Sequence, residues 1–391
     1  MKSCSRCLAD SRYGIDIDSS GVCSYCRIVD EFIHVIERIG NEEDILQDRL
    51  HMFRDKGRYD CIVGLSGGKD SSYIIYTLKT KYDARVLAFT CDNGFLTDYA
   101  RDNINGIVND FGVDHIWVKP DEELRQALYS NDLKKECWPC SACVHMGESS
   151  IWKLAYENRI PFIVSGRTPE QILRKPDRDL FESKNSIIRD NFSAYDRDRV
   201  HAMALAVLKR INMEKDWLLP RDSRRLRDSS SIYLEENFTG SDDFVPEYLY
   251  FFLYEKHEEL KMMETLERET NWRNPKKIGL LSHLDCTAHD AAGYLFYKMH
   301  GVPFVGLETS AMIRHNHLDR QQGREIILKE TASSIDYPDE SFQALSKITG
   351  FPPRRIRLLP YMIKARRFMK GRIKKILGMN KKINCSIQAR R

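Results

Sequence analysis

The residues best suited to chemistry form a short turn, Ser66-Gly67-Gly68-Lys69-Asp70-Ser71, between an apolar run and an amphipathic run. Glycines allow the backbone to approach an anion closely, and the N–H groups that open the following helix point toward that anion. The two serines add hydroxyl donors and Lys69 adds a positive charge, while Asp70 can hold Mg²⁺ through water or orient the turn. We therefore predict a phosphate-binding loop; the alternative is a glycine-rich turn without a ligand.

Two Cys-x-x-Cys pairs near the amino terminus form a second chemical cluster, Cys4, Cys7, Cys23 and Cys26. Four thiolates at this spacing can close a tetrahedral zinc site. A module of residues 1–28 is too small to fold on its own apolar core, so a metal would supply its stability. We predict a structural zinc ribbon without a catalytic role, against the alternatives of a redox or iron site.

A third group of cysteines, Cys137, Cys140 and Cys143, lies in the segment ECWPCSAC, just before a predicted helix at 147–158. Cysteines are often simply buried, but three at this spacing favour an iron–sulfur or catalytic site, with zinc and plain packing as alternatives. Nearby or downstream histidines are candidate additional ligands, although each alone is more often a satisfied core or surface residue: His145, His283 and His289.

The carboxyl-terminal segment, residues 351–391, contains fourteen Lys and Arg and no acidic residue. Apolar residues recur among the cations at roughly helical spacing, at Ile363, Phe368, Met369, Ile373, Ile376 and Leu377. Such a basic amphipathic helix can lie on an anionic membrane surface or contact the phosphates of RNA. The alternative is a solvated tail without a partner.

The elements that must position these groups alternate between strand and helix. Apolar runs predict strands at 59–65, 84–92, 115–120 and 160–166, with helices between them, and this alternation predicts a doubly wound parallel sheet. Ligands bind such sheets at the carboxyl ends of the strands. We divide the chain into a ribbon (1–28), a helical linker (29–58), a nucleotide-binding domain (59–175), a helical substrate region (176–350) and a basic tail (351–391).

The composition indicates the cellular compartment in which this chemistry would take place. The chain has 391 residues, 42% of them hydrophobic and 30% charged, and contains no apolar run long enough for a membrane span. Its start, MKSCSRC, lacks the apolar core of a secretory signal. We expect a cytoplasmic protein, peripheral to the inner membrane face if its tail binds lipid. In this reducing compartment clustered cysteines indicate metal or catalytic sites rather than disulfides.

The SGGKDS turn resembles the PP-loop of the ATP pyrophosphatases, which have a PP-loop (HUP-like) α/β fold. That family grips the β- and γ-phosphates of ATP and leaves the α-phosphate open to attack. The resemblance implies adenylation of an acceptor with release of pyrophosphate and Mg²⁺ as the metal. It also implies adenosine contacts where the second and fourth strands end, at Asp92 and Gly166.

The order of ribbon, linker and PP-loop resembles the N-acetyl sugar amidotransferases of surface-polysaccharide (lipopolysaccharide) biosynthesis. The similarity covers CSRC and GVCSYC, then YDCIVGLSGGKDSSY and the DNG turn, and resumes loosely within 246–350. It implies that a sugar acetamido oxygen is adenylated and replaced by nitrogen from ammonia. A separate glutaminase partner would supply the ammonia.

The ECWPCSAC segment instead resembles the Cys-x-x-Cys of PP-loop tRNA sulfurtransferases. That resemblance implies a [4Fe-4S] cluster on Cys140, Cys143 and Cys286, a sulfur-donor partner, and a nucleobase, tRNA or small molecule as acceptor. The sequence favours the amidotransferase because its resemblance spans more residues; a non-catalytic nucleotide-binding module is a third hypothesis. The predicted catalytic residues are Lys69, Asp70, Cys140 and Cys143, and the candidate general bases are His115, His283 and His289.

Overall fold

A computed structural model describes residues 2–54, 56–219, 226, 232–234, 244–274 and 285–388, with side chains up to Arg372 apart from Gly371. His283 and the side chains of Ile373, Ile376 and Leu377, all named above, lie outside the described residues. Among the described helices, none combines the length and the apolar character that a membrane span requires.

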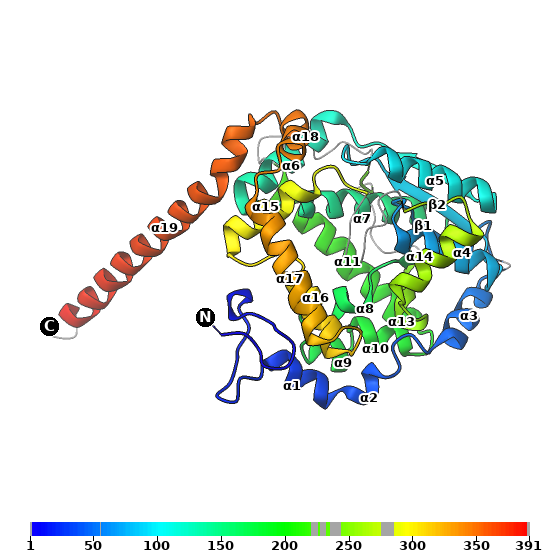
Figure 1. The fold of residues 1–391 in the computed structure, drawn as a ribbon, viewed down its shortest axis with the longest axis horizontal. Helices are drawn as coiled ribbons and strands as arrows, with labels where there is room; N and C mark the ends of the chain where they lie inside the picture. The colour runs from blue at the N-terminus through cyan, green and yellow to red at the C-terminus, as the bar shows by residue number, and fades with distance from the viewer. Residues whose placement is uncertain are drawn as a thin grey trace.

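Five parallel strands form the central sheet in the order β3-β2-β1-β4-β5 (Figure 1). In the register, Cys61 of β1 lies opposite Val86 of β2 and Phe162 of β4. The first four strands match the predicted apolar runs: β1 Cys61–Gly64, β2 Val86–Cys91, β3 Asp114–Val118 and β4 Phe162–Ser165. The predicted α/β fold with a parallel sheet is therefore confirmed.

Helices cover both faces of this sheet because alternate residues of each buried strand point to opposite sides. Cys61 and Val63 pack on α4 (Lys69–Thr80), α5 (Asp98–Phe111) and α14 (Glu259–Glu269). Ile62 packs on the other side, against α7 (Cys140–Glu157) and α11 (Arg197–Leu218). This arrangement is the doubly wound sheet that the sequence predicts.

The fifth strand, β5 (Glu247–Tyr250), is not among the four predicted strands and lies at the start of the region predicted to be mainly helical. Apart from Glu247, the run EYLYFFLY is apolar and fits either a buried strand or a helix. Its one acidic residue, Glu247, is buried, and its Oε1 lies 2.9 Å from Nη1 of Arg49 and 3.2 Å from Nη2 of Arg199. These two arginines compensate the buried charge of Glu247 at the edge of the sheet. The sheet therefore extends beyond the predicted domain boundary at residue 175.

The cysteine segment of residues 137–143 spans a corner between two helices. Helix α6 (Glu122–Glu136) ends on Cys137, whose φ of 58° is left-handed, and α7 already begins at Cys140. The predicted start at residue 147 was therefore wrong by two turns, since Pro139 opens the helix rather than interrupting it. Cys140 and Cys143 consequently share one face of the first turn of α7, and Cys137 points elsewhere.

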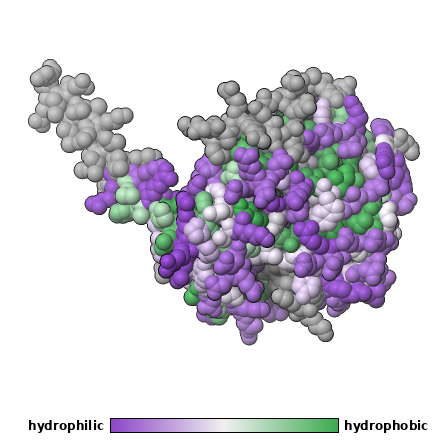
Figure 2. Space-filling model, turned by 90° about the horizontal axis from the view of Figure 1, so that it is seen from above, coloured by the Kyte–Doolittle hydropathy of each residue, from purple (hydrophilic) through white to green (hydrophobic). Residues whose placement is uncertain are grey.

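The remaining elements form two groups. The amino-terminal module and linker contain η1 Ser11–Tyr13, α1 Ser24–Glu31, α2 Ile33–Ile36 and α3 Glu43–Met52. The region after β4 is mainly helical, as predicted: α8 Pro169–Leu173, α9 Asp179–Glu182, α10 Ile187–Phe192, α13 Phe251–Tyr254, α15 His289–His300, α16 Gly306–Arg314, α17 Arg320–Ile335, α18 Asp339–Thr349 and α19 Pro353–Gln388. Helix α19 extends from the body as a single long arm (Figures 1 and 2).

The loop between β1 and α4 is fixed against α5 by a close backbone approach at Gly67. Its φ is +79°, and a Cβ added there would lie 2.2 Å from the carbonyl oxygen of Ala100. The carbonyl oxygen of Gly67 accepts hydrogen bonds from Asn103 Nδ2 at 3.2 Å and from Trp272 Nε1 at 3.0 Å. Only glycine fits this position, because any side chain would displace the loop from α5.

We predict that Gly67→Ala lowers the free energy of unfolding by about 2–5 kcal/mol, the sum of left-handed backbone strain and overpacking. Gly112→Ala is the matched control, because Gly112 also has a positive φ, of 56°, but nothing lies within 4 Å of an added Cβ. That variant should lose only the strain, about 1–2 kcal/mol. Equal losses for the two variants in urea titrations would contradict the close approach.

Candidate active site

The loop Ser66–Ser71 is closed by its own hydrogen bonds. The N–H of Ser66 donates to Ser71 Oγ at 3.1 Å, the N–H of Gly68 donates to Ser66 Oγ at 3.3 Å, and Ser71 Oγ donates to the Gly68 carbonyl at 3.2 Å. No side chain caps α4, which begins directly at Lys69. The N–H groups of its first turn are therefore oriented toward the position where an anion would bind.

The charged residues of the loop are held by acidic and basic partners from distant segments. Lys69 Nζ lies 3.0 Å from Glu259 Oε1 and 3.3 Å from Asp70 Oδ2. On its other side Asp70 is paired through Oδ1 with His257 Nε2, at 3.0 Å. The sequence analysis missed His257 and Glu259. The signal that could have found them is the group of charged residues, YEKHEEL, that directly follows the apolar run leading out of β5.

The same chain of charges continues to the carboxyl-terminal helices. His257 Nδ1 lies 3.5 Å from Glu170 Oε2, and Glu170 Oε1 lies 2.6 Å from His317 Nδ1. Carboxylates therefore alternate with Lys and His side chains from Lys69 to His317. This chain of contacts joins the loop to Glu170 on α8 and to His317 after α16, which lie far from the loop in the sequence.

The alternation fixes the charge states within the network. Burial opposes ionisation of Asp70 and Glu170, but their cationic partners outweigh it and lower the pKa of each carboxyl to about 2. Burial likewise opposes a charged His257, but the hydrogen bond to Asp70 and the two carboxylates raise its pKa above the ordinary value. The loop carboxylate is thereby held ionised, as a Mg²⁺ ligand must be.

Glu308 on α16 is the exception in this network. Its side chain is buried, and burial together with the negative charge of Glu170 raises its pKa to about 7. The folded state therefore binds a proton that the unfolded chain releases near pH 4.5. This carboxyl lowers stability progressively as the pH rises from about 4.5 to about 7.

We predict that Glu308→Gln becomes more stable relative to the parent protein as the pH rises through that window, by up to about 3 kcal/mol, because Gln does not titrate. Urea unfolding at several pH values measures the difference. Glu264→Gln, the same substitution at an exposed residue of α14, serves as control for the loss of a carboxylate from the protein surface. A flat profile for Glu308→Gln would refute the assignment.

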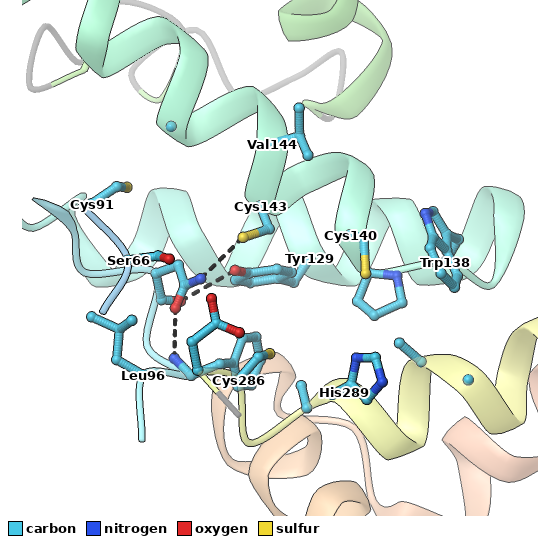
Figure 3. Close-up of a pocket in the computed structure, with 18 of the residues that line it drawn as sticks. Ser66, Cys91, Leu96, Tyr129, Trp138, Cys140, Cys143, Val144, Cys286 and His289 are labelled. Atoms are coloured by element: carbon cyan, nitrogen blue, oxygen red, sulfur yellow. Dashed lines mark hydrogen bonds between the residues drawn. The ribbon is translucent and has the colours of Figure 1, made fainter. Parts of the chain in front are cut away.

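A cavity of about 450 Å³ connects the phosphate loop to the cysteine segment. Ser66 lies at one end and Trp138 at the other, with Cys140, Cys143 and Cys286 on the walls between them (Figure 3). Much of the remaining lining is apolar, including Leu65, Phe89, Phe95, Tyr129, Val144, Ala288 and Phe304. The three cysteines predicted to hold a cluster, Cys140, Cys143 and Cys286, thus face one space with Ser66 of the loop.

Cys286 reaches this cavity through a short antiparallel pairing with the segment after β2. Leu96 pairs with Cys286, and the N–H of Thr287 donates to the carbonyl oxygen of Phe95 at 2.7 Å. The pairing brings a residue from beyond the described sheet strands to the same edge as the loop. No pattern in the sequence specifies this contact; only the chemical expectation of a third thiolate pointed to Cys286.

Cys143 is oriented by the turn at the end of β2. Asn93 Nδ2 donates to Cys143 Sγ at 3.0 Å, and Asn93 is itself fixed because its Oδ1 accepts from the N–H of Phe95 at 2.8 Å. Tyr129 adds a hydrogen bond from its hydroxyl to the Asn93 carbonyl at 3.2 Å. The DNG turn, predicted to contact the nucleotide through Asp92, therefore also holds a cysteine through Asn93.

Asp92 and Gly166, the two positions expected to contact adenosine, are not among the residues that line the cavity. Asp92 is paired with Arg101 at 3.2 Å and accepts from the N–H of Gly94. Gly166 follows β4, where an added Cβ would lie 3.1 Å from Ile74 Cδ1. Their roles toward adenosine stay predictions.

The histidines and the remaining cysteines occupy different surroundings. His289 lines the cavity, whereas His145 is buried between Glu214 and Tyr233 and His115 contacts Thr90 at 2.8 Å. Cys137 lines a separate cavity of about 290 Å³. Cys91, at the end of β2, is an additional thiol on the main cavity that the sequence analysis did not single out.

The cavity thiols are spaced differently from the amino-terminal ones. Among the residues that the structure describes, only the four amino-terminal cysteines form a group of three or more metal-ligating atoms that all lie within 4.8 Å of one another. An iron–sulfur cluster binds each thiolate on a different iron atom, so its ligands stand further apart than those of one ion. Burial raises the pKa of Cys140 and Cys143, and it raises that of Cys286 to about 12, so binding of a metal would release their protons.

Cys140 lies in the wall between two spaces. Besides the apolar cavity it lines a second one of about 530 Å³, which also contains Arg167, Arg174 and Trp217. Arg174 contacts the ring face of Phe304 at 5.9 Å. The first turn of α7 therefore separates an apolar compartment from one that contains guanidinium groups.

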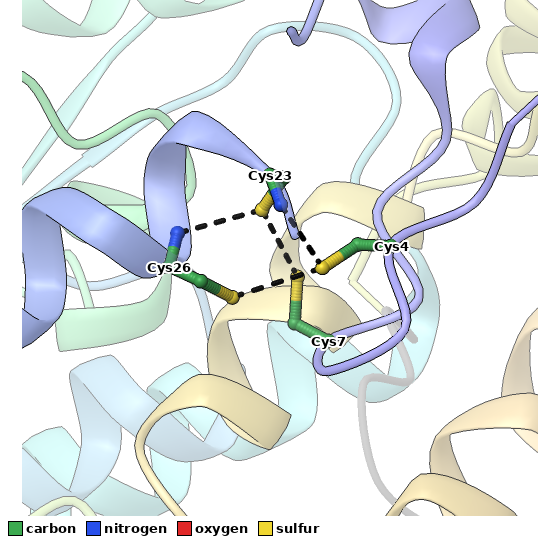
Figure 4. A group of neighbouring side chains, drawn as sticks. All are labelled: Cys4, Cys7, Cys23 and Cys26. Atoms are coloured by element: carbon green, nitrogen blue, oxygen red, sulfur yellow. Dashed lines mark hydrogen bonds between the residues drawn. The ribbon is translucent and has the colours of Figure 1, made fainter. Parts of the chain in front are cut away.

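The amino-terminal cysteines converge on one point, as predicted (Figure 4). The Sγ atoms of Cys4 and Cys26 are 3.9 Å apart, and those of Cys7 and Cys23 are 3.6 Å apart. Backbone N–H groups of Arg6 and Cys23 donate to Cys4 Sγ at 3.4 and 3.3 Å, which stabilises a thiolate. A set of four buried sulfur donors fits a tetrahedral zinc ion.

This cysteine module packs on α16 and the segment after it, through Leu307, Met312, Ile313 and Leu318. Arg314 joins the two parts, because its Nη1 donates to Cys7 Sγ at 3.5 Å and its Nη2 to the carbonyl oxygen of Leu173 on α8 at 3.0 Å. The module thus supports the helix that precedes His317.

Comparison with known proteins gives distant likenesses. No protein-family model matches the sequence. The uncharacterised protein MJ1599 of Methanocaldococcus jannaschii is 25% identical over 166 residues, which are 42% of this chain and 58% of that protein's length.

Two solved structures are also similar to the chain. The U34-tRNA thiolase NcsA from Methanococcus maripaludis, with its [4Fe-4S] cluster, has a TM-score of 0.36 and 14% identity over 90% of this chain and 99% of that one. NMN synthetase from Francisella tularensis has a TM-score of 0.25 and 13% identity over 62% of this chain and 98% of its own. At these low values the site itself must carry the functional assignment.

Proposed function

We propose that the protein is a PP-loop ATP pyrophosphatase that adenylates an acceptor carbonyl and replaces its oxygen with sulfur. One observation carries this proposal: a single apolar cavity contains both Ser66 of the phosphate loop and the three thiols of Cys140, Cys143 and Cys286. An adenylated carbon formed beside the loop would meet a sulfur source without leaving the site.

In the first step the loop holds the β- and γ-phosphates of ATP through its N–H groups and Lys69, with Mg²⁺ bound near Asp70. The acceptor oxygen attacks the α-phosphorus, the bond to the β-phosphate oxygen breaks, and pyrophosphate leaves. Lys69 and the first turn of α4 offset the charge that develops on the leaving group. His257 and Glu259 hold the two charged loop residues in position.

In the second step hydrosulfide, supplied by a sulfur-donor partner, attacks the adenylated carbon. The carbon–oxygen bond breaks, AMP leaves with the former carbonyl oxygen, and the proton of hydrosulfide goes to solvent, so C=O becomes C=S. A [4Fe-4S] cluster on Cys140, Cys143 and Cys286 would keep one iron without a protein ligand, which supplies a site for sulfide. Asn93 orients Cys143, and the apolar lining excludes water that would otherwise hydrolyse the adenylate.

The sugar amidotransferase, which the sequence favours, is the alternative. Ammonia transfer to an acetamido sugar needs the same adenylation but no thiol, and the cysteine-lined cavity therefore supports sulfur transfer better. The acceptor classes that we propose are a nucleobase, a tRNA or a small molecule. For either reaction we propose that zinc binds in the amino-terminal module. It would stabilise this module, which packs against α16.

We predict that Lys69→Ala weakens ATP binding roughly 10- to 100-fold, since hydrogen bonds to charged groups contribute about 1.5–3 kcal/mol. Titration calorimetry with ATP and Mg²⁺ measures this affinity. Lys79→Ala is the matched control at the far end of α4, where Lys79 donates to the carbonyl oxygen of Ala84. A Lys69→Ala protein that binds ATP as tightly as the control would exclude the loop as the nucleotide site.

We predict that anaerobically purified protein is brown and holds roughly four iron and four sulfide per chain, together with zinc. Cys140→Ala, Cys143→Ala and Cys286→Ala should each lose iron and retain zinc, because they face the cavity. Cys137→Ala, three residues before Cys140 but on another cavity, is the control and should retain both metals.

The double variant Cys23→Ala/Cys26→Ala should show the reverse pattern and lose zinc. Elemental analysis of each protein provides the measurement. Colourless wild-type protein that contains zinc alone and co-purifies with a glutaminase would overturn sulfur transfer in favour of the amidotransferase.

A further inference from the structure

The first half of α19 is anchored on the body by one face. Ile356, Leu359 and Ile363 are buried against α6, α15 and α18, within the same core as Phe342. Arg367 on this side pairs with Glu136 of α6 at 2.5 Å. The orientation of the helix up to this point is therefore fixed by packing.

The opposite face of α19 carries an exposed apolar stripe. Its large members are between 54% and 65% exposed: Leu358, Tyr361, Met362, Phe368 and Met369. Ala365 continues the stripe between them. With roughly 100° of rotation per residue, these positions cover about 120° of the circumference and are centred roughly opposite the buried face. Five large apolar side chains thus point away from the protein along one line.

Cations border this stripe on both edges. By the same rotation, Arg357 and Lys364 lie along one edge and Arg355 and Arg366 along the other. Among the described residues none of these four has a carboxylate within ion-pair distance, although Arg355 and Arg357 contact the rings of Phe351 and Tyr337. Residues 351–391 contain no acidic side chain at all. Figure 2 shows the described part of the arm projecting from the body, with hydrophilic and hydrophobic patches side by side.

We propose that α19 lies in the surface of a membrane that contains anionic lipid. The apolar stripe would enter the boundary between headgroups and acyl chains, and the long Arg and Lys side chains would extend from both edges to the lipid phosphates. The anchored face keeps the body, with its cavity, on the aqueous side. This placement is independent of the reaction proposed above.

Two other occupants fit the stripe less well. RNA would pair with the cations but would leave the Leu and Met side chains in water. A second copy of α19 would cover the stripe but would bring the cations of both edges against each other, which opposes a coiled coil. Anionic lipid alone satisfies both the apolar stripe and the charge that borders it.

The test is flotation of the full-length protein with vesicles. Vesicles of phosphatidylcholine and phosphatidylglycerol in equal amounts should bind the protein, and vesicles of phosphatidylcholine alone should bind it at least roughly 10-fold more weakly. Phe368→Ser/Met369→Ser should reduce binding roughly 10-fold or more, because it removes insertion, and Lys364→Gln/Arg366→Gln should reduce it to a similar extent. Leu328→Ser, a change at an exposed apolar residue of α17, is the matched control and should bind normally.

Three outcomes would overturn the proposal. The first is equal binding by Phe368→Ser/Met369→Ser and the parent protein, which would leave only electrostatic adsorption. The second is absent vesicle binding together with RNA binding that the Lys364→Gln/Arg366→Gln variant loses. The third is a dimer in sedimentation without vesicles that the Phe368→Ser/Met369→Ser variant converts to monomer. ATP affinity of these variants should equal that of the parent protein, which separates this test from that of the reaction.

Discussion

The site depends on the hydrogen bonds that two side chains donate to one carbonyl oxygen. Asn103 of α5 and Trp272 after α14 both donate to Gly67, and the missing side chain at Gly67 lets its backbone lie against Ala100. These contacts set where α4 begins and therefore where its first N–H groups point. The charges of Lys69 and Asp70 are then held by Glu259 and His257, which belong to the segment that leads into α14. One part of the chain thus fixes both the backbone of the loop and its charges.

The cysteine side of the cavity has a separate framework that meets the loop through the segment after β2. Asn93 orients Cys143, and Leu96 pairs with Cys286, so two thiols are positioned by a turn that immediately follows a sheet strand. The third thiol, that of Cys140, is positioned by the corner at Cys137, after which α7 begins at Cys140. Cys140 and Cys143 lie on a helix, and sites built on helices are held more precisely than sites on loops, so these two thiols keep a defined position relative to the phosphate loop.

The sheet and the local motifs could be predicted from the sequence because both depend on patterns among residues close together in the chain. The four apolar runs from β1 to β4 and the SGGKDS turn each depend on neighbouring residues. The strand at Glu247 was missed because its charge is satisfied by Arg49, nearly two hundred residues earlier in the chain. The same applies to the contact of Asp70 with His257, 187 residues apart. Such pairings carry no local signature.

The position of Cys140 between two unlike compartments has a consequence for traffic through the site. One side of this thiol faces a largely apolar space that reaches the phosphate loop, and the other faces a space with Arg167 and Arg174. Molecules that arrive from the two sides would be sorted by polarity before they meet. In the reaction we propose, an anionic sulfur donor would be attracted to the guanidinium side and the activated acceptor would lie in the apolar cavity, so the two would approach Cys140 from different sides.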